Sequence, residues 1–200
     1  MAIVKVKNIV ILASGSGSNF QAIIDAVNRG DISARISALI TNNPGAYALE
    51  RAKGYGIPSF LIDPLKYSSR EEYDDALLEL LTGMDPGLIV LAGYMLLLGE
   101  QIVTKFKGRI INIHPALLPS FKGKHGIRDA FEFGVKVTGV TVHFVDEDMD
   151  SGEIITQEAV VVLDDDTLQM LEERIHMVEH RIYPQTIARL LDGDLARKEK

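Results

Sequence analysis

The chain has 200 residues, of which 46% are hydrophobic and 24% are charged, and its formal net charge is −7 at pH 7. This composition predicts a folded globular protein, and the acidic charge argues against a nucleic-acid or anionic-membrane partner, because both require a concentrated basic patch. The chain has no cysteine, which excludes disulfides, thiol nucleophiles and thiolate metal ligands. Its first apolar run is too short to span a bilayer and no cleavable signal is evident, so we expect a cytoplasmic protein.

Short apolar runs alternate with helical periodicity over the first 114 residues. Strands are predicted over 8–13, 35–41, 58–62, 88–92 and 109–114, and helices over about 19–29, 46–55, 69–81 and 99–106. This alternation predicts an α/β fold: a Rossmann-like open, mostly parallel sheet with helices on both faces. Such sheets bind ligands in the crevice beyond the carboxyl ends of their strands.

The pattern changes after residue 135. Residues 136–145 and 152–162 are typical of two longer strands joined by an acidic loop, which predicts a C-terminal antiparallel excursion. A long final helix is expected over about 167–188, with an apolar stripe formed by Leu168, Leu171, Ile175, Val178 and Ile182. No repeat, low-complexity tract or linker interrupts the sequence, so we expect residues 1–200 to form a single domain.

The segment ASGSGSNFQAII, residues 13–24, lies where the first strand turns into the first helix. Gly15 and Gly17 let the backbone approach a ligand, Ser18 or Asn19 can cap the helix, and the free N–H groups at its start attract an anion such as phosphate. An ordinary tight turn explains these residues equally well. The segment is not a nucleotide fingerprint, because Phe20 replaces the third glycine of the dinucleotide motif and no Gly-Lys-Ser/Thr follows.

The segment INIHP, residues 111–115, sets an amide and an imidazole at the end of a buried strand. Asn112 and His114 are two residues apart and therefore point to the same face, and Pro115 ends the strand. Both side chains can donate to a carbonyl oxygen that gains charge, which favours an oxyanion site over two structural residues.

Other polar residues give weaker signals. His143 lies within a strand, and His176 and His180 have the i, i+4 spacing of a metal pair, but without an HExxH glutamate or a third ligand a zinc site is disfavoured. The acidic residues of 146–150 normally form a solvated turn and lack EF-hand spacing. One of them can instead lie beside an imidazole, orient its ring and raise its pKa.

Five segments occur together in this chain: GSGSN, LAGYM, NIHPALLPS, GVTVHFVDEDMDSG and HMVEHRIYP. In combination they closely resemble the phosphoribosylglycinamide formyltransferase family, the folate-dependent glycinamide ribonucleotide transformylases of purine synthesis. The likeness extends from Lys7 to about Gly193. The Asn-x-His, Leu-Leu-Pro and distal Asp elements belong to all formyltransferases, whereas the narrower assignment depends on the phosphate loop, VEHRIYP and the compact length.

The resemblance implies a formyltransferase fold and transfer of formyl from 10-formyltetrahydrofolate, a co-substrate, to the amine of 5′-phosphoribosylglycinamide, with no metal. The implied catalytic group is Asn112, His114 and Asp150, in which Asn112 and protonated His114 stabilise the oxyanion and Asp150 favours the imidazolium. The residues implied for the ribonucleotide are Gly17, Ser18, Asn19, His176, Met177, Val178 and Glu179. Those implied for the folate are Arg70, Met95, Leu96, Leu97, Leu98, Asn112, Asp146, Glu147, Asp148, Met149 and Asp150.

Three positions qualify this transfer of residues. The family commonly reads GYMRIL or GFMRIL, whereas this chain has Leu96 in place of the arginine, which removes a candidate partner for the folate and leaves the catalytic positions untouched. His125 matches a histidine near the substrate's phosphate and glycinamide end. Without the resemblance, Glu179 is interpreted as a solvated helix residue.

Alternatives stay open within and beyond this family. A formyltetrahydrofolate hydrolase uses water in place of the amine, but it ordinarily has an extra N-terminal domain, for which we expect no room in 200 residues. Methionyl-tRNA formyltransferase is a weaker rival, because it needs a tRNA-binding domain and this chain is acidic. A noncatalytic folate- or phosphate-ligand-binding module would bind without turnover. For the preferred function the expected partners are small molecules, with no nucleic acid and no membrane, and the sequence leaves monomer or homodimer open.

Overall fold

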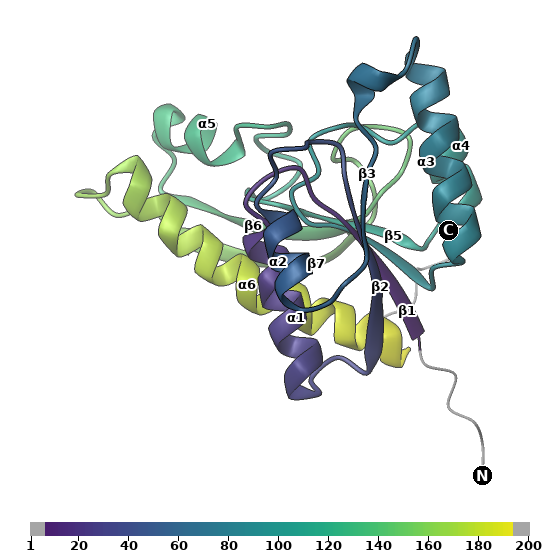
Figure 1. The fold of residues 1–200 in the computed structure, drawn as a ribbon. Coiled ribbons are helices and arrows are strands. Elements are labelled where there is room, and N and C mark those ends of the chain that lie inside the picture. The colour runs from purple at the N-terminus through teal and green to yellow at the C-terminus, as the bar shows by residue number, and fades with distance from the viewer. Residues whose placement is uncertain (1–6, 194–200) are drawn as a thin grey trace.

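The computed structural model describes residues 7–193, and in them seven strands form one sheet between layers of helices (Figure 1). The strands are β1 (Lys7–Leu12), β2 (Ala34–Thr41), β3 (Ser59–Leu61), β4 (Leu88–Leu91), β5 (Ile110–His114), β6 (Val137–Phe144) and β7 (Ile154–Val161). The helices are α1 (Ser18–Arg29), α2 (Ala48–Gly54), α3 (Arg70–Met84), α4 (Glu100–Lys105), α5 (Gly126–Phe133) and α6 (Leu168–Asp192). The ends of the predicted 1–200 domain lie outside the described residues.

The strand order is β3-β2-β1-β4-β5-β6-β7. From β3 to β5 neighbouring strands are parallel, and β6 is antiparallel to both β5 and β7. The predicted mostly parallel sheet with an antiparallel excursion is therefore confirmed. Because the chain moves from β1 to one side of the sheet and later returns to β4 on the other, the loops after β1 and β4 diverge and leave room for a ligand between them.

The sheet is buried on both faces by two hydrophobic cores. Alternate residues of β1 belong to different cores, because successive side chains of a strand point to opposite faces. Ile9 and Ile11 pack in the core that includes residues of α1, α2 and α6, and Val10 and Leu12 pack in the core that includes residues of α3 and α4. Figure 1 shows α1, α2 and α6 on one side of the sheet and α3 and α4 on the other.

Capping residues at both ends set the length of the last helix, α6. The Thr167 hydroxyl accepts the Met170 N–H at 3.2 Å, and α6 continues past the predicted residue 188 until Gly193 adopts a left-handed conformation with φ 85°. The predicted stripe omitted several members of the buried face, among them Glu179, Tyr183 and Ile187. Glu179 is only 6% exposed, so its interpretation as a solvated residue was wrong.

The sequence reasoning missed α5, a short helix over Gly126–Phe133. Its 8 residues are fewer than the span over which helical periodicity can be recognised in a sequence, and a left-handed Gly134 ends it. The predicted helices at 46–55 and 99–106 begin later and end earlier than expected, and α3 extends beyond residue 81 because a left-handed residue first occurs at Asp85.

Candidate active site

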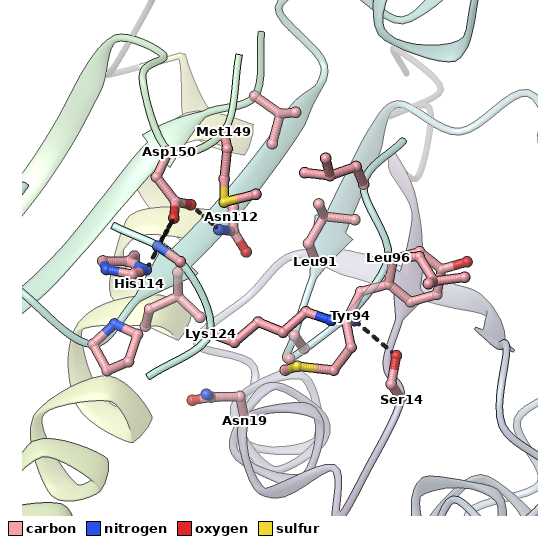
Figure 2. Close-up of a pocket in the computed structure, with 18 of the residues that line it drawn as sticks. Ser14, Asn19, Leu91, Tyr94, Leu96, Asn112, His114, Lys124, Met149 and Asp150 are labelled. Atoms are coloured by element: carbon pink, nitrogen blue, oxygen red, sulfur yellow. Dashed lines mark hydrogen bonds and ion pairs between the residues drawn. The ribbon is translucent and has the colours of Figure 1, made fainter. Parts of the chain in front are cut away.

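A crevice of about 470 Å³ opens at the carboxyl ends of β1, β4 and β5 (Figure 2). This volume lies in the range of small-molecule sites. Its lining comes from the β1–α1 turn at residues 14–19, residues 91–98, residues 112–115, Gly123 and Lys124, residues 143 and 145–150, and His176 and Glu179 of α6. The topology thus brings together the glycine-rich turn, the INIHP strand end and the acidic loop.

The glycine-rich turn owes its shape to Gly17. This residue has φ 70°, and a side chain there would set its Cβ 2.9 Å from the Cβ of Ala48. Gly17 is also the N-cap of α1 and gives the helix no side-chain cap, so the expectation that Ser18 or Asn19 caps α1 was wrong. Arg51 of α2 supports the turn by donating from Nε to the Ser16 carbonyl at 2.8 Å. The helix start therefore faces the crevice with N–H groups that no capping side chain occupies.

Asn19 and Glu179 form a buried polar pair beside this turn. Asn19 is 8% exposed, and its Nδ2 donates to Glu179 Oε2 at 3.3 Å. Burial raises the pKa of Glu179 to about 7, although the bond from Asn19 opposes this rise. Among the described residues, the buried Oδ1 of Asn19 has no hydrogen-bond partner. A buried acceptor without a partner at a crevice wall is what a donor on a bound ligand would satisfy.

Only part of the predicted α6 set reaches the crevice. His176 and Glu179 are three residues apart, so they share a helix face, and both line the crevice. Met177 and Val178 are turned away from that face and line a separate shallow depression against β7. The helical geometry therefore does not bring these two predicted ribonucleotide residues to the crevice.

Asp150 lies between Asn112 and His114, with which it forms a polar cluster. Its Oδ2 accepts the Gly123 N–H at 2.9 Å and lies 3.4 Å from His114 Nδ1. Asp150 adopts φ 49°, an uncommon left-handed conformation for a residue with a side chain, at a cost of about 1 kcal/mol or more. Burial raises the pKa of Asp150, but the neighbouring His143 ring, the Gly123 N–H and the His114 ring lower it further than burial raises it. Asp150 is therefore ionised at neutral pH.

His114 differs from the expectation in its charge. The ring is 3% exposed, and its Nε2 lies 2.8 Å from the carbonyl oxygen of Phe121, so Nε2 carries the donated proton. Burial lowers the pKa of His114, and Asp150 and the Phe121 carbonyl only partly restore it, so the net shift is downward. Asp150 thus acts in the expected direction, but burial opposes the expectation that it keeps the imidazole protonated. The direction of the shift favours a neutral ring near pH 7 in the free protein, with Nδ1 turned to Asp150.

His143 is a site residue that sequence reasoning undervalued. It is 2% exposed and stands opposite Asn112 in the antiparallel pair of β5 and β6. His143 Nδ1 lies 2.8 Å from the Phe144 carbonyl, so Nδ1 carries the proton and Nε2 accepts the Asn112 amide at 3.2 Å. The second hydrogen of this amide has only a 3.5 Å contact with Asp150 Oδ1. Only the pairing of β5 with β6 shows that His143 belongs to the site. The sequence alone does not reveal that these two strands are neighbours.

The predicted folate segment forms the opposite wall. Met95, Leu96, Leu97 and Leu98 line the crevice, and Ser14 links this segment to the glycine-rich turn by accepting the Met95 N–H at 2.8 Å. Arg70 does not line the crevice. It pairs with Asp74 and donates to the Leu97 carbonyl oxygen, so it holds the segment from behind. Sequence reasoning missed Ser14, whose only signal was its place two residues after the end of β1.

The acidic loop completes the lining. Asp146, Glu147, Asp148, Met149 and Asp150 all face the crevice. The Ser151 hydroxyl contacts Asp146 Oδ1 at 3.1 Å and the Asp148 carbonyl at 2.9 Å, which folds the loop on itself. This internal bonding explains how a run of carboxylates brings Asp150 to His114.

His125 and the His176–His180 pair lie apart from the Asn112, His114 and Asp150 cluster, although His176 lines the crevice. His125 is the N-cap residue of α5 and does not line the crevice. His176 and His180 stack with ring centroids 6.3 Å apart.

Within residues 7–193, no three His, Asp or Glu side chains are grouped to hold a metal ion. No helix in that range has the length and apolarity that a membrane span requires.

The crevice lies where the loops after β1 and β4 diverge. It joins an anion-attracting turn to a cluster of an amide, an imidazole and a carboxylate, and this combination is typical of a group-transfer enzyme. Residues 7–187 match the formyl transferase family, and the chain belongs to it. It is 44% identical to phosphoribosylglycinamide formyltransferase of Bacillus subtilis (strain 168), over 92% of this chain and 95% of that protein. It is 42% identical to the human trifunctional purine biosynthetic protein adenosine-3 over 94% of this chain, which is 19% of the human protein. Glycinamide ribonucleotide transformylase 1 from Symbiobacterium toebii superposes with a TM-score of 0.93 at 46% identity, covering 96% of this chain and 91% of that one.

Proposed function

We propose that this chain transfers the formyl group of 10-formyltetrahydrofolate to the amine of 5′-phosphoribosylglycinamide, a step of purine biosynthesis that yields formylglycinamide ribonucleotide and tetrahydrofolate. The observation that carries the proposal is that the glycine-rich turn and the Asn112, His114 and Asp150 cluster open on one crevice. A transferase needs this arrangement, because much of its rate advantage comes from holding two substrates in reactive geometry. We infer a single cytoplasmic domain that acts as a monomer or homodimer.

The acceptor is assigned to the side of α1 and α6. The N–H groups of Gly17, Ser18 and Asn19 would bind its phosphate, because the start of α1 has no side-chain cap. The unpartnered Oδ1 of Asn19 and the buried Glu179 would accept from the ribose hydroxyls. His176 lies on the same face and would contact the sugar. This orientation directs the glycinamide amine toward His114.

The donor is assigned to the other wall. Its reduced pterin would lie against the segment Met95–Leu98 and beside the loop 146–150, which both face the crevice. Apolar side chains suit an aromatic heterocycle, and backbone and carboxylate groups supply its polar partners. The formyl group would then lie between the amine and Asn112.

The reaction begins when the amine nitrogen attacks the formyl carbon. The new C–N bond converts the formyl oxygen into an oxyanion, which we assign to the second Asn112 amide hydrogen, since its contact with Asp150 is long. His143 Nε2 accepts the first amide hydrogen of Asn112 and thereby fixes the plane of the amide. Asn112 would thus be the oxyanion donor and His143 its positioning residue.

One proton must move from the amine to the folate nitrogen. Neutral His114 can accept it at Nδ1, because Nε2 already carries a proton toward Phe121. The resulting imidazolium lies beside Asp150 and the Phe121 carbonyl, both of which stabilise its charge. His114 then returns the proton to the folate nitrogen, the old C–N bond breaks, and tetrahydrofolate leaves with no net proton taken up.

A turnover assay with and without the acceptor tests this proposal. The protein is incubated with 10-formyltetrahydrofolate, and tetrahydrofolate is measured by absorbance while formylglycinamide ribonucleotide is measured by mass spectrometry. We expect both products in equal amounts and only when the ribonucleotide is present. Tetrahydrofolate without the acceptor would identify a hydrolase, and binding of both substrates without either product would identify a noncatalytic module.

A further inference from the structure

Lys124 follows directly after the residue that anchors the catalytic carboxylate. Gly123 donates its N–H to Asp150 Oδ2 at 2.9 Å and adopts φ 95°, a conformation that favours glycine. The next residue, Lys124, lines the crevice. Figure 2 shows its side chain extended from the His114 side across the crevice toward Tyr94 and Ser14. A residue tied to the reaction centre thus directs an ammonium group toward the glycine-rich turn.

The charges around the crevice are unbalanced. Of the described residues that line it, Lys124 is the only lysine or arginine, whereas five carry carboxyl groups: Asp146, Glu147, Asp148, Asp150 and Glu179. A phosphate that enters such a site meets like charges, which disfavour its binding unless a cation accompanies it. The N–H groups of α1 supply only partial charge.

The nearby guanidinium groups are already occupied. Arg51 donates to the Ser16 carbonyl and to Gln21 Oε1, and Arg70 pairs with Asp74 and contacts the Leu97 carbonyl. Neither lines the crevice. Lys124, by contrast, makes no ion pair or hydrogen bond with another residue of the described chain, and it is exposed. Its ammonium is therefore available to a ligand and is not needed to hold the fold.

We propose that Lys124 binds the phosphate of the ribonucleotide acceptor from across the crevice, opposite the glycine-rich turn. The inference rests on the proposed function and adds to it a residue that determines acceptor specificity. A single lysine serves a phosphate as a point charge and needs no fixed bidentate geometry, which suits a flexible side chain at a crevice mouth.

The test compares Lys124→Met with Lys122→Met, which removes the same charge two residues away at an exposed position that does not line the crevice. Binding of glycinamide ribonucleotide without folate is measured by calorimetry at low and high salt, and steady-state kinetics follow with both substrates. We expect Lys124→Met to weaken ribonucleotide binding at low salt by about tenfold or more, the usual scale of a charge-assisted hydrogen bond. The weakened variant should also show a smaller salt dependence, and the folate KM and saturated kcat should stay near wild type.

Further variants separate charge from shape and from the reaction itself. Lys124→Arg should restore most of the affinity, and the dephosphorylated riboside should bind equally to wild type and Lys124→Met. Equal ribonucleotide affinity of Lys124→Met and Lys122→Met would overturn the inference, as would a loss confined to kcat. If wild type itself binds no ribonucleotide, the proposed acceptor is wrong, and this result is distinct from failure of Lys124 alone.

Discussion

The two walls of the crevice are built in different ways. The wall assigned to the ribonucleotide is made of buried polar groups on helices α1 and α6: Asn19 is 8% exposed and Glu179 is 6% exposed. The wall assigned to the folate is made of loop residues with exposed apolar side chains, such as Met95 at 49% and Met149 at 46%. One wall is thus fixed by the fold itself, and the other is tied to it by a few contacts from Ser14 and Arg70.

This difference teaches which property a substitution should change. On the ribonucleotide wall, binding groups are also core groups, so changes there should affect stability and acceptor binding together. On the folate wall, changes should affect folate binding with little cost in stability. Asn112, His114 and Asp150 lie between the walls, and changes there should affect the chemical step.

The largest expected effect is a loss of kcat on substitution of the residues between the two walls. Asn112→Ala removes the proposed oxyanion donor and should lower kcat by about 100-fold to 1000-fold, with small changes in both KM values. His143→Gln, which alters the partner of the amide, should lower kcat by less and leave both substrates bound. Single-turnover kinetics check the assignment. A loss that appears only in the KM for either substrate would show that Asn112 binds and does not catalyse.

Glu179→Gln tests the cost of building the ribonucleotide wall from a buried carboxyl. Because the pKa of Glu179 is raised from 4.5 to about 7, the native state binds more protons than the unfolded state in this window. The free energy of unfolding of the wild type should therefore fall by up to ~3 kcal/mol as the pH rises from about 4.5 to about 7. The free energy of unfolding of Glu179→Gln should not show this fall, because glutamine does not titrate. Urea unfolding at pH 5 and pH 8 measures it, with the exposed Glu173→Gln of the same helix as control. Parallel curves for wild type and Glu179→Gln would refute the account, and the variant should also bind the ribonucleotide more weakly.

Gly17→Ala sharpens the comparison at the turn. The new Cβ would lie 2.9 Å from Ala48 Cβ at a residue with φ 70°, so we expect a loss of about 1–2 kcal/mol of stability and a raised ribonucleotide KM. Gly15→Ala is the stability control, because no atom lies within 4 Å of the position that its new methyl group would take. Thermal unfolding and the KM values for both substrates are measured for the wild type and the two variants. A rise in the folate KM alone would mean that the two substrates have been assigned to the wrong walls.

The smallest effect is expected on the folate wall. Leu96→Arg introduces the charged residue that the family commonly carries, at a position that lines the crevice and packs partly against the second core. Folate KM should change by a few-fold while kcat and the ribonucleotide KM stay near wild type. A large defect in a single turnover at saturating folate would show that Leu96 shapes the reaction geometry.

The sequence predicted what depends on local pattern and failed where contacts across the sheet decide. Ile9 to Leu12 and the INIHP strand end could be predicted from apolar runs, and the fold class followed from their alternation. His143 was undervalued because its role depends on strand order, which places it opposite Asn112. Glu179 was buried by packing of α6 against α1, a contact that no local pattern reveals. Lys124 was missed because an exposed lysine in a loop has no sequence signal for the crevice it enters.

The charge of His114 is the part of the site on which the structure and the sequence-based expectation differ most. The structure indicates a neutral ring because burial outweighs the attraction of Asp150. If His114 must be neutral to accept the amine proton, kcat/KM should fall on the acid side as the ring becomes protonated. Asp150→Asn removes an influence that raises the pKa of His114, so the acid limb should move to lower pH while kcat falls at every pH.

Titration of the His114 ring by NMR in the free protein and in Asp150→Asn tests this claim most directly. We predict a midpoint below the ordinary value of 6.5 in wild type and a still lower midpoint in Asp150→Asn, because the carboxylate is the neighbour that favours the imidazolium. His143→Gln in a parallel sample assigns the two buried histidine signals. A wild-type midpoint well above 6.5 would mean that His114 is charged before the substrates bind, and its role as acceptor of the amine proton would be contradicted.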